Sequence, residues 1–308
     1  VRNTFVATSK LMPTADSVGQ DFDALRYLIQ KAHAARFDVH PWFCVTYRDR
    51  HFRRWFADKF GTSVDMLDRD GKVIDLGADV HRPEYRQFIV DLMVGVASDY
   101  AVDGIHLDYI RSMDRCFCDA CKKEFAQQYA KPLTEATEDD WVRWQRQAIG
   151  DIVERTAKGV RQARPGAKMS AAVFANLSGG ASQGQDPAAW AQAGWTDLIL
   201  PMDYQMQALQ VRANERQFLA ALANDDQLVT GLSLYMRAGG AVSSRPCALR
   251  LWFSWMMKLN TFRSCWRNMF ASRSFRLRGR KGSVSTLTDP AFPLMKASSS
   301  VPTWKWRM

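Results

Sequence analysis

The sequence predicts an α/β protein that folds as a (β/α)8 barrel of the TIM type, with the first and last strands missing and an irregular basic tail. Three observations support this fold class. Strand-like and helical patterns alternate at spacings of roughly 30 to 50 residues, which is typical of parallel βαβ units. The 308 residues leave room for a barrel of about 250. The alternative is a doubly wound open sheet, but no G-x-G-x-x-G follows a strand to support it.

The expected strands are short apolar runs whose side chains alternate between two faces. Residues 102–110 (VDGIHLDYI) illustrate the pattern, because His106 and Asp108 share one face while Ile105 and Leu107 share the other. The main strands are expected at residues 3–8, 38–47, 102–110, 168–175, 196–204 and 228–235. Residues 66–75 add a hairpin, since Asp70-Gly71 supplies its turn.

The expected helices combine apolar residues at helical spacing with recognisable ends. Pro83 fits a first helical position, and Arg164-Pro165-Gly166 ends a long helix. Helices are expected at residues 21–37, 51–60, 83–96, through the cysteines that follow residue 115, and at 138–163, 186–193 and 214–223. Residues 177–185 (LSGGASQGQ) are expected to form a loop.

The formal charge of +10 lies entirely in the last quarter of the chain. Residues 231–308 hold 14 Lys and Arg against one acid, Asp289, which leaves 28 basic and 31 acidic residues before them. Electrostatic binding of nucleic acid needs a basic face on a folded module, and the body of the chain offers none. We therefore expect no nucleic-acid partner for the body.

The tail also lacks agreement between its local signals. Beyond Tyr235 no stretch combines a helical or strand-like spacing of apolar residues with the caps and turns that such an element needs. Disagreement of this kind is typical of a sequence that does not specify a fold. We expect a partial barrel over residues 1–236 and an irregular basic tail over residues 237–308. A shifted reading frame after about Met236 is a hypothesis that would explain the change.

Targeting signals are few. No run of 18 or more apolar residues occurs, so no transmembrane helix is expected. The start, VRNTFVATS, has no signal-peptide pattern, which leaves the localisation open. We expect no cofactor, and the oligomeric state stays open.

Polar side chains gather at the carboxyl ends of the strands, where a barrel of this type has its active site. Asp108 and Asp203 end two strands, and two carboxyls are what hydrolysis of a glycosidic bond requires: one protonates the leaving oxygen while the other attacks or activates water. We expect this pair to be catalytic. The substrate-binding candidates are His40, Trp42, His106, Tyr109, Arg111, Tyr204 and Tyr235.

The sequence neighbours of the two carboxyls suggest their roles. Arg111 and His106 should keep the pKa of Asp108 low, which suits a nucleophile or base. Asp203 follows an apolar run, so burial should raise its pKa and make it the proton donor. Simpler interpretations stay open: Asp108 as a partner of Arg111 or a helix cap, His106 as a supporting hydrogen-bond partner, and His40 and Trp42 as barrel filling.

Three cysteines follow the Asp108 strand in a C-x-C-x-x-C pattern: Cys116, Cys118 and Cys121. Packing or a disulfide is one interpretation, and a redox motif is another. A zinc site needs a fourth ligand, which Asp114 or Asp119 could supply, although we expect no metal. We expect Asp79 to serve a turn. The cysteines would then pin a loop at the rim of the site.

Four motifs together carry a family resemblance: VDGIHLDYIR, VHPWF, LPMDY and the Cys-x-Cys-x-x-Cys element. They resemble the glycosyl hydrolase-like family 10 group, over roughly residues 1–236. The resemblance implies a bacterial TIM-barrel protein of carbohydrate metabolism, often exported, some relatives cleaving peptidoglycan glycan strands. By this resemblance we expect the leading strand of the family, with its Trp motif, and the final strand to be missing from this chain. Ser112-Met113 stand where an aromatic residue and Pro commonly follow.

Three functions follow in order of preference. The first is a glycosidase that cleaves O-glycosidic bonds of a polysaccharide with the Asp108 and Asp203 pair. The second is a glycan-binding barrel without catalysis, which uses the same aromatic cup. The third is nucleic-acid binding through the basic tail.

Overall fold

The computed structural model describes residues 11–12, 22–205, 207–232, 277–278 and 284–285. The strand expected at residues 3–8, Tyr235 and most of the tail lie outside these residues. The chain divides into two compact units, Val1–Trp252 and Phe253–Met308. In the second unit the structure describes an antiparallel pair of short strands, β7 (Leu277–Arg278) and β8 (Val284–Ser285). The boundary expected near residue 236 stays a prediction.

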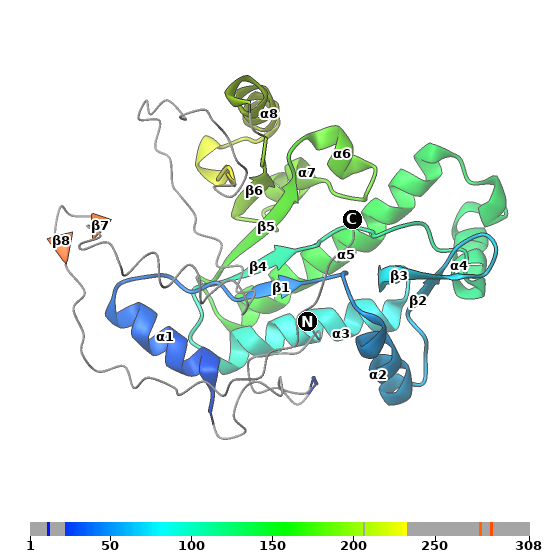
Figure 1. Cartoon of the computed structure of the whole chain (residues 1–308), viewed down its shortest axis with the longest axis horizontal. Helices are drawn as coiled ribbons and strands as arrows, with labels where there is room; N and C mark the ends of the chain where they lie inside the picture. Colours follow the sequence, from blue (N-terminus) through cyan, green and yellow to red (C-terminus); the bar gives the residue numbers. More distant parts are fainter. Residues whose placement is uncertain (1–10, 13–21, 206, 233–276, 279–283, 286–308) are drawn as a thin grey trace, which may run out of the picture. The chain divides into compact units, whose positions relative to one another are not determined.

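A parallel sheet forms the centre of the first unit, as an α/β fold requires. Its described strands follow the order β1-β4-β5-β6 and run side by side in Figure 1. Their bounds are β1 Trp42–Cys44, β4 Gly104–Asp108, β5 Lys168–Phe174 and β6 Leu198–Met202. Parallel bridges from Ile199 to Leu228 and from Met202 to Gly231 continue the order beyond β6, where the last strand was expected. This is part of a (β/α)8 barrel, and the predicted fold class is confirmed.

The helices that cover the sheet include α3 (Pro83–Asp99) and α5 (Glu138–Ala163), which pack together (Figure 1). Both begin as the sequence predicts. Pro83 occupies the first turn of α3, and Thr137 and Asp140 form a capping box at the start of α5. The face of the sheet toward these helices is apolar: Ile105, Leu107, Met169, Ala171, Val173 and Ile199 join one buried cluster with residues of α3 and α5.

The other helices mostly match the expected ranges. They are α1 Ala24–Ala34, α2 Arg50–Phe60, α4 Asp119–Tyr129, α6 Leu177–Ala181, α7 Pro187–Gln192 and α8 Ala208–Ala221, with 3-10 turns η1 Leu133–Glu135 and η2 Asp225–Gln227. Two expectations were wrong. The expected loop contains α6, because Asn176 caps it by accepting from the Gly179 N–H at 2.7 Å. The helix expected from Asn214 begins at Ala208.

The predicted hairpin is present as β2 (Asp65–Leu67) and β3 (Val73–Ala78), which pair antiparallel. Gly71 in its turn has φ +79°, a conformation that glycine adopts without strain. In the described part of the chain, no helix has the length and apolar character that a membrane crossing demands.

Candidate active site

Asp108 ends β4 with its carboxyl held by two donors. The indole Nε1 of Trp42 donates to Oδ2 at 2.9 Å, and the backbone N–H of Tyr109 donates to Oδ1 at 2.6 Å. The register between β1 and β4 pairs Cys44 with Asp108 and Trp42 with His106, which puts these side chains on the face opposite the helices. Asp108 is buried. It therefore lies where a barrel of this type has its active site.

The electrostatic expectation for Asp108 was wrong. Burial raises the pKa of this carboxyl above its usual value, and the bonds from Tyr109 and Trp42 together with the charge of Arg111 offset the effect only in part. No Asp108–Arg111 ion pair occurs among the described residues. Neither does Asp108 cap the next helix, since Cys118 caps α4. A carboxyl with a raised pKa suits proton donation better than attack.

The two histidines lie deeper on the same face. His106 is buried, and its Nδ1 lies 2.9 Å from the Ser170 hydroxyl of β5. Burial lowers the pKa of His106 to about 3, with the charge of His40 as a second cause, so the ring is neutral at ordinary pH. The ring of His40 occupies the space above Gly104, where an added Cβ would come within 2.5 Å of it. This geometry favours support of the site over contact with a substrate.

Aromatic side chains surround Asp108 at the open end of the sheet. Trp42, Tyr47 and Tyr204 are exposed, by 43%, 43% and 45%. The Tyr109 ring packs against Tyr47 with centroids 5.2 Å apart, and Tyr109 itself has φ 49°. Such a conformation is strained in a residue with a Cβ and is found at functional sites. Burial raises the pKa of Tyr204, and the charge of Asp108 raises it further. Tyr204, which follows β6, therefore lies within electrostatic range of Asp108.

Arg111 lies among the same rings. Its guanidinium carbon is 4.6 Å from the Tyr109 ring centroid and 4.8 Å from that of Phe174 at the end of β5. These distances fit cation–π contacts, which hold the positive charge near Asp108 without a direct ion pair. The structure thus brings Trp42, Tyr109, Arg111 and Tyr204 together around Asp108. Tyr235 lies outside the described residues.

Asp203 has a different environment. Its exposed fraction is 1%, and its Oδ2 accepts from Asn214 Nδ2 of α8 at 3.0 Å. Asp203 lies one residue beyond β6, and its N–H donates to the Pro201 carbonyl at 2.9 Å, so the chain turns here and the alternation of the strand no longer applies. Its Oδ1 has no hydrogen-bond partner within the described part of the chain. The carboxyl of Asp203 therefore points toward α8, whereas the side chain of the next residue, Tyr204, lies near Asp108.

The cysteines are free thiols in the structure, so a disulfide among them is not formed. Cys116 and Cys121 are buried, and Cys118 is partly buried. Neither Asp114 nor Asp119 joins them: the side chain of Asp119 is 99% exposed and pairs with Lys122. The carboxyl that does reach the cysteines is Asp79, from the residue after β3. Its Oδ1 also accepts from the His81 N–H at 3.0 Å, the turn contact that was expected.

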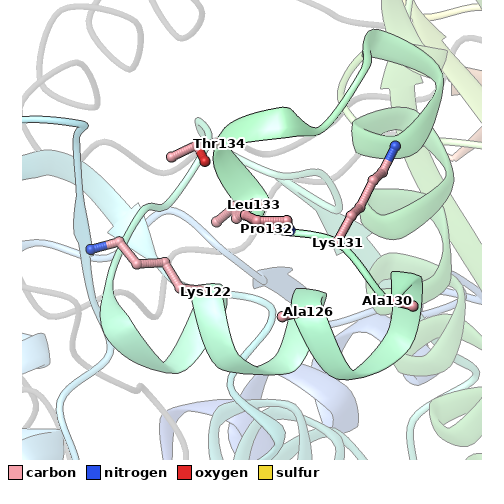
Figure 2. Close-up of a pocket in the computed structure, with 7 residues that line it drawn as sticks. All are labelled: Lys122, Ala126, Ala130, Lys131, Pro132, Leu133 and Thr134. Atoms are coloured by element: carbon pink, nitrogen blue, oxygen red, sulfur yellow. The ribbon is translucent and has the colours of Figure 1, made fainter.

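A hollow of about 590 Å³ lies elsewhere, between α4 and η1 (Figure 2). Its charged side chains are Lys122 and Lys131, which point away from each other in the figure. Each of them pairs with a carboxylate, Lys122 with Asp119 and Lys131 with Asp140. With no carboxyl in its lining, the hollow offers no acid–base pair.

Sequence reasoning missed Tyr47, Phe174 and Asp79 as members of these clusters. Tyr47 and Phe174 stand at or beyond strand ends, so the rule that found Tyr109 could have found them. Asp79 offered no such signal, because only the fold brings it to cysteines 37 or more residues away.

Comparisons with known proteins agree with the fold. The glycoside hydrolase domain of PgaB (BpsB) from Bordetella bronchiseptica matches with a TM-score of 0.53 and 13% identity, over 72% of this chain and 66% of that domain. An alpha-L-fucosidase isoenzyme 2 from Paenibacillus thiaminolyticus gives 0.49 and 17%, over 64% of this chain and 28% of its own. A beta-galactosidase from Bacillus circulans sp. alkalophilus gives 0.48 and 12%, over 66% and 36%.

The chain thus spans about a third of the length of the fucosidase and galactosidase chains. A search of curated proteins finds no match. A family model provides the assignment, because the model described as Glycosyl hydrolase-like 10 matches residues 3–250, which is most of the sequence. Together with the parallel sheet and the polar face that ends in Asp108, this match establishes that the chain belongs to the Glycosyl hydrolase-like 10 family.

Proposed function

We propose that this chain hydrolyses O-glycosidic bonds of a polysaccharide, with Asp108 as the carboxyl that transfers the proton. The observation that carries the proposal is the setting of Asp108: a buried carboxyl at the end of β4, held by Trp42 and Tyr109 on the polar face of the sheet. Family membership supports a glycan as the substrate class. Peptidoglycan glycan strands are the first substrate to test.

Asp108 suits the role of general acid. Burial raises its pKa, which favours the protonated form needed to donate to a leaving oxygen. The Trp42 indole fixes the orientation of one oxygen. This assignment reverses the roles expected from sequence neighbours, because burial outweighs the charge of Arg111.

The exposed rings provide the binding surface of the proposal. Trp42, Tyr47 and Tyr204 offer flat apolar faces on which sugar rings stack. Arg111 supplies donors for sugar hydroxyls or for a carboxylate on the glycan. His40 and His106 support this surface from below, and Tyr235 remains a proposed contact.

Asp203 is the proposed second carboxylate, which activates water. Strand β5 separates β4 from β6, so the two carboxyls belong to strands that are not neighbours. The free Oδ1 of Asp203 supports the role, and the bond from Asn214 opposes it. The experiment must therefore test this residue separately.

The test measures new reducing ends after the full chain is incubated with peptidoglycan glycan strands and with a panel of neutral and amino-sugar polysaccharides. We expect turnover on at least one substrate and a loss of about a hundredfold or more in Asp108→Asn. Asp119→Asn, an exposed carboxyl on α4, is the matched control and should retain full activity. No turnover on any glycan by a folded chain would contradict the proposal.

One observation favours a second function, a glycan-binding barrel without catalysis. Asp203 bonds Asn214 away from Asp108, which leaves one carboxyl in the aromatic cup. Such a protein would bind a glycan with an affinity that Trp42→Ala lowers, and would release no reducing ends. The third hypothesis, nucleic-acid binding through the basic tail, concerns residues mostly outside the described part of the chain and stays a prediction.

A further inference from the structure

We propose that Cys116, Cys118, Cys121 and Asp79 form a binding site for a single zinc ion. The three sulfur atoms and a carboxylate oxygen of Asp79 all lie within 4.8 Å of one another. Ligands at zinc distances of about 2.0 to 2.3 Å form a tetrahedron with edges of roughly 3.3 to 3.8 Å. Small movements of these side chains would therefore complete the coordination shell.

The site joins two segments that lie apart in the sequence. Asp79 directly follows β3, whereas the cysteines lie between β4 and the first turn of α4. Within the cluster, Cys121 Sγ lies 3.0 Å and Cys118 Sγ 3.8 Å from Asp79 Oδ2. One carboxylate oxygen thus faces the sulfurs, while the other accepts the His81 N–H. Four protein ligands close the shell, which is the pattern of a structural zinc site.

Backbone donors already support two of the sulfurs. The Leu67 N–H points to Cys116 Sγ at 3.4 Å, and the Cys121 N–H points to Cys118 Sγ at 3.4 Å. Donors of this kind orient metal ligands and stabilise the negative charge of thiolates. The hairpin and the start of α4 thus hold the ligands in place from two sides.

Packing alone does not account for the carboxyl. Asp79 is fully buried, and no Lys or Arg side chain pairs with it among the described residues. A buried carboxylate without a cation is costly, and a divalent ion beside it removes that cost. The compact arrangement fits one ion, and sulfur-rich tetrahedral ligands select zinc over magnesium or calcium.

The site has a structural purpose in this fold. Cys116 and Cys121 belong to a small second core with Met66, Phe125 and Trp144, separate from the main one. A core of this size contributes little stability alone, and metal binding adds to the free energy of folding. The ion would fix the far end of the loop after β4, the loop that carries Tyr109 and Arg111.

Elemental analysis of the full chain, purified under reducing conditions, tests the proposal first. We expect about one zinc per chain, and tetrahedral thiolate bands in the visible spectrum after exchange with Co²⁺. Cys118→Ser should lower the zinc affinity at least about tenfold. Cys44→Ser, a free cysteine outside the cluster, should keep the metal. So should the double variant Cys247→Ser and Cys265→Ser, at two cysteines that lie outside the described residues.

Asp79 provides the discriminating variants. Asp79→Leu removes the ligand and should lose zinc, whereas Asp79→Cys restores a fourth ligand and should retain it, with a stronger thiolate band for Co²⁺. A packing role predicts no such difference. If the reduced wild-type chain contains no metal and takes up neither Zn²⁺ nor Co²⁺, the proposal is wrong. It is equally wrong if the metal survives in Cys118→Ser and Asp79→Leu but is lost from the double variant.

Discussion

The indole Nε1 of Trp42 donates a hydrogen bond to Oδ2 of Asp108 at 2.9 Å, across neighbouring strands. Register makes this contact possible. Trp42 pairs with His106, one step before Asp108 on the same face, so a long side chain reaches the carboxyl diagonally. The bond favours the ionised form of Asp108, against the burial that raises its pKa. Trp42 thereby sets both the position and the proton affinity of the proposed catalytic group.

Trp42→Phe should move the basic limb of the pH profile of kcat/KM to higher pH. The variant keeps an aromatic face and loses the donor that lowers the pKa of Asp108, so this pKa rises and the acid stays protonated to higher pH. Trp55→Phe, at an indole that packs against Phe52 and Phe88, should leave the limb in place. An unmoved limb in Trp42→Phe would show that Asp108 is not the acid.

Asp108→Asn should lose far more activity on a natural glycan than on a substrate with an activated leaving group. A good leaving group needs little protonation, so removal of the acid costs about a hundredfold or more only on the poor one. Asp203→Asn should lose activity on both if Asp203 activates water. The opposite pattern assigns the roles the other way, and full activity of Asp203→Asn removes this residue from the mechanism.

Wild-type protein should lose stability between about pH 6.5 and 3 through His106. Burial lowers the pKa of His106 in the folded state to about 3. Between about pH 6.5 and 3 this histidine is therefore protonated in the unfolded chain and neutral in the native state. The contribution of neutral His106 to the free energy of unfolding is fully present above the pKa of the unfolded chain. It falls by several kcal/mol as the pH drops from about 6.5 to 3. His106→Gln should reduce the loss in urea unfolding, whereas His51→Gln, at an exposed position, should not.

Asn214→Ala should lower the free energy of unfolding by about 1 to 3 kcal/mol. The substitution leaves the buried Oδ2 of Asp203 without its donor, and an unsatisfied buried carboxylate carries a desolvation cost. Gln217→Ala, exposed on the same helix, should stay within about 0.5 kcal/mol of wild type. Equal stability of the two variants in urea unfolding would show that Asp203 does not depend on α8.

Joint substitution of Cys116, Cys118 and Cys121 by Ser should lower the melting temperature and leave turnover of the folded fraction within about tenfold, or about 1.4 kcal/mol of barrier. In the proposed zinc site all four ligands come from the protein, so the chemistry at Asp108 does not need the atoms of this cluster. Thermal unfolding and active-fraction kinetics measure the two effects. A larger loss of turnover in the folded fraction would assign the cluster a part in the reaction.

The alternation of elements and the polar face of β4 follow from the amino-acid pattern alone. A period of two residues placed His106 and Asp108 opposite Ile105 and Leu107, and the structure keeps that division. Helix boundaries with strong signals were equally predictable: residues 138–163 match α5, and Arg164-Pro165-Gly166 marks its end in the sequence.

Which charged groups come into contact depends on how distant segments pack together. The direction of Asp203 depends on α8, which supplies Asn214, and the pKa of Asp108 depends on burial rather than on its neighbour Arg111. Asp79 reaches Cys121 only because β3 and the start of α4 fold against each other. Local periodicity follows from backbone geometry within one element, whereas these contacts depend on desolvation and packing between segments far apart in the chain.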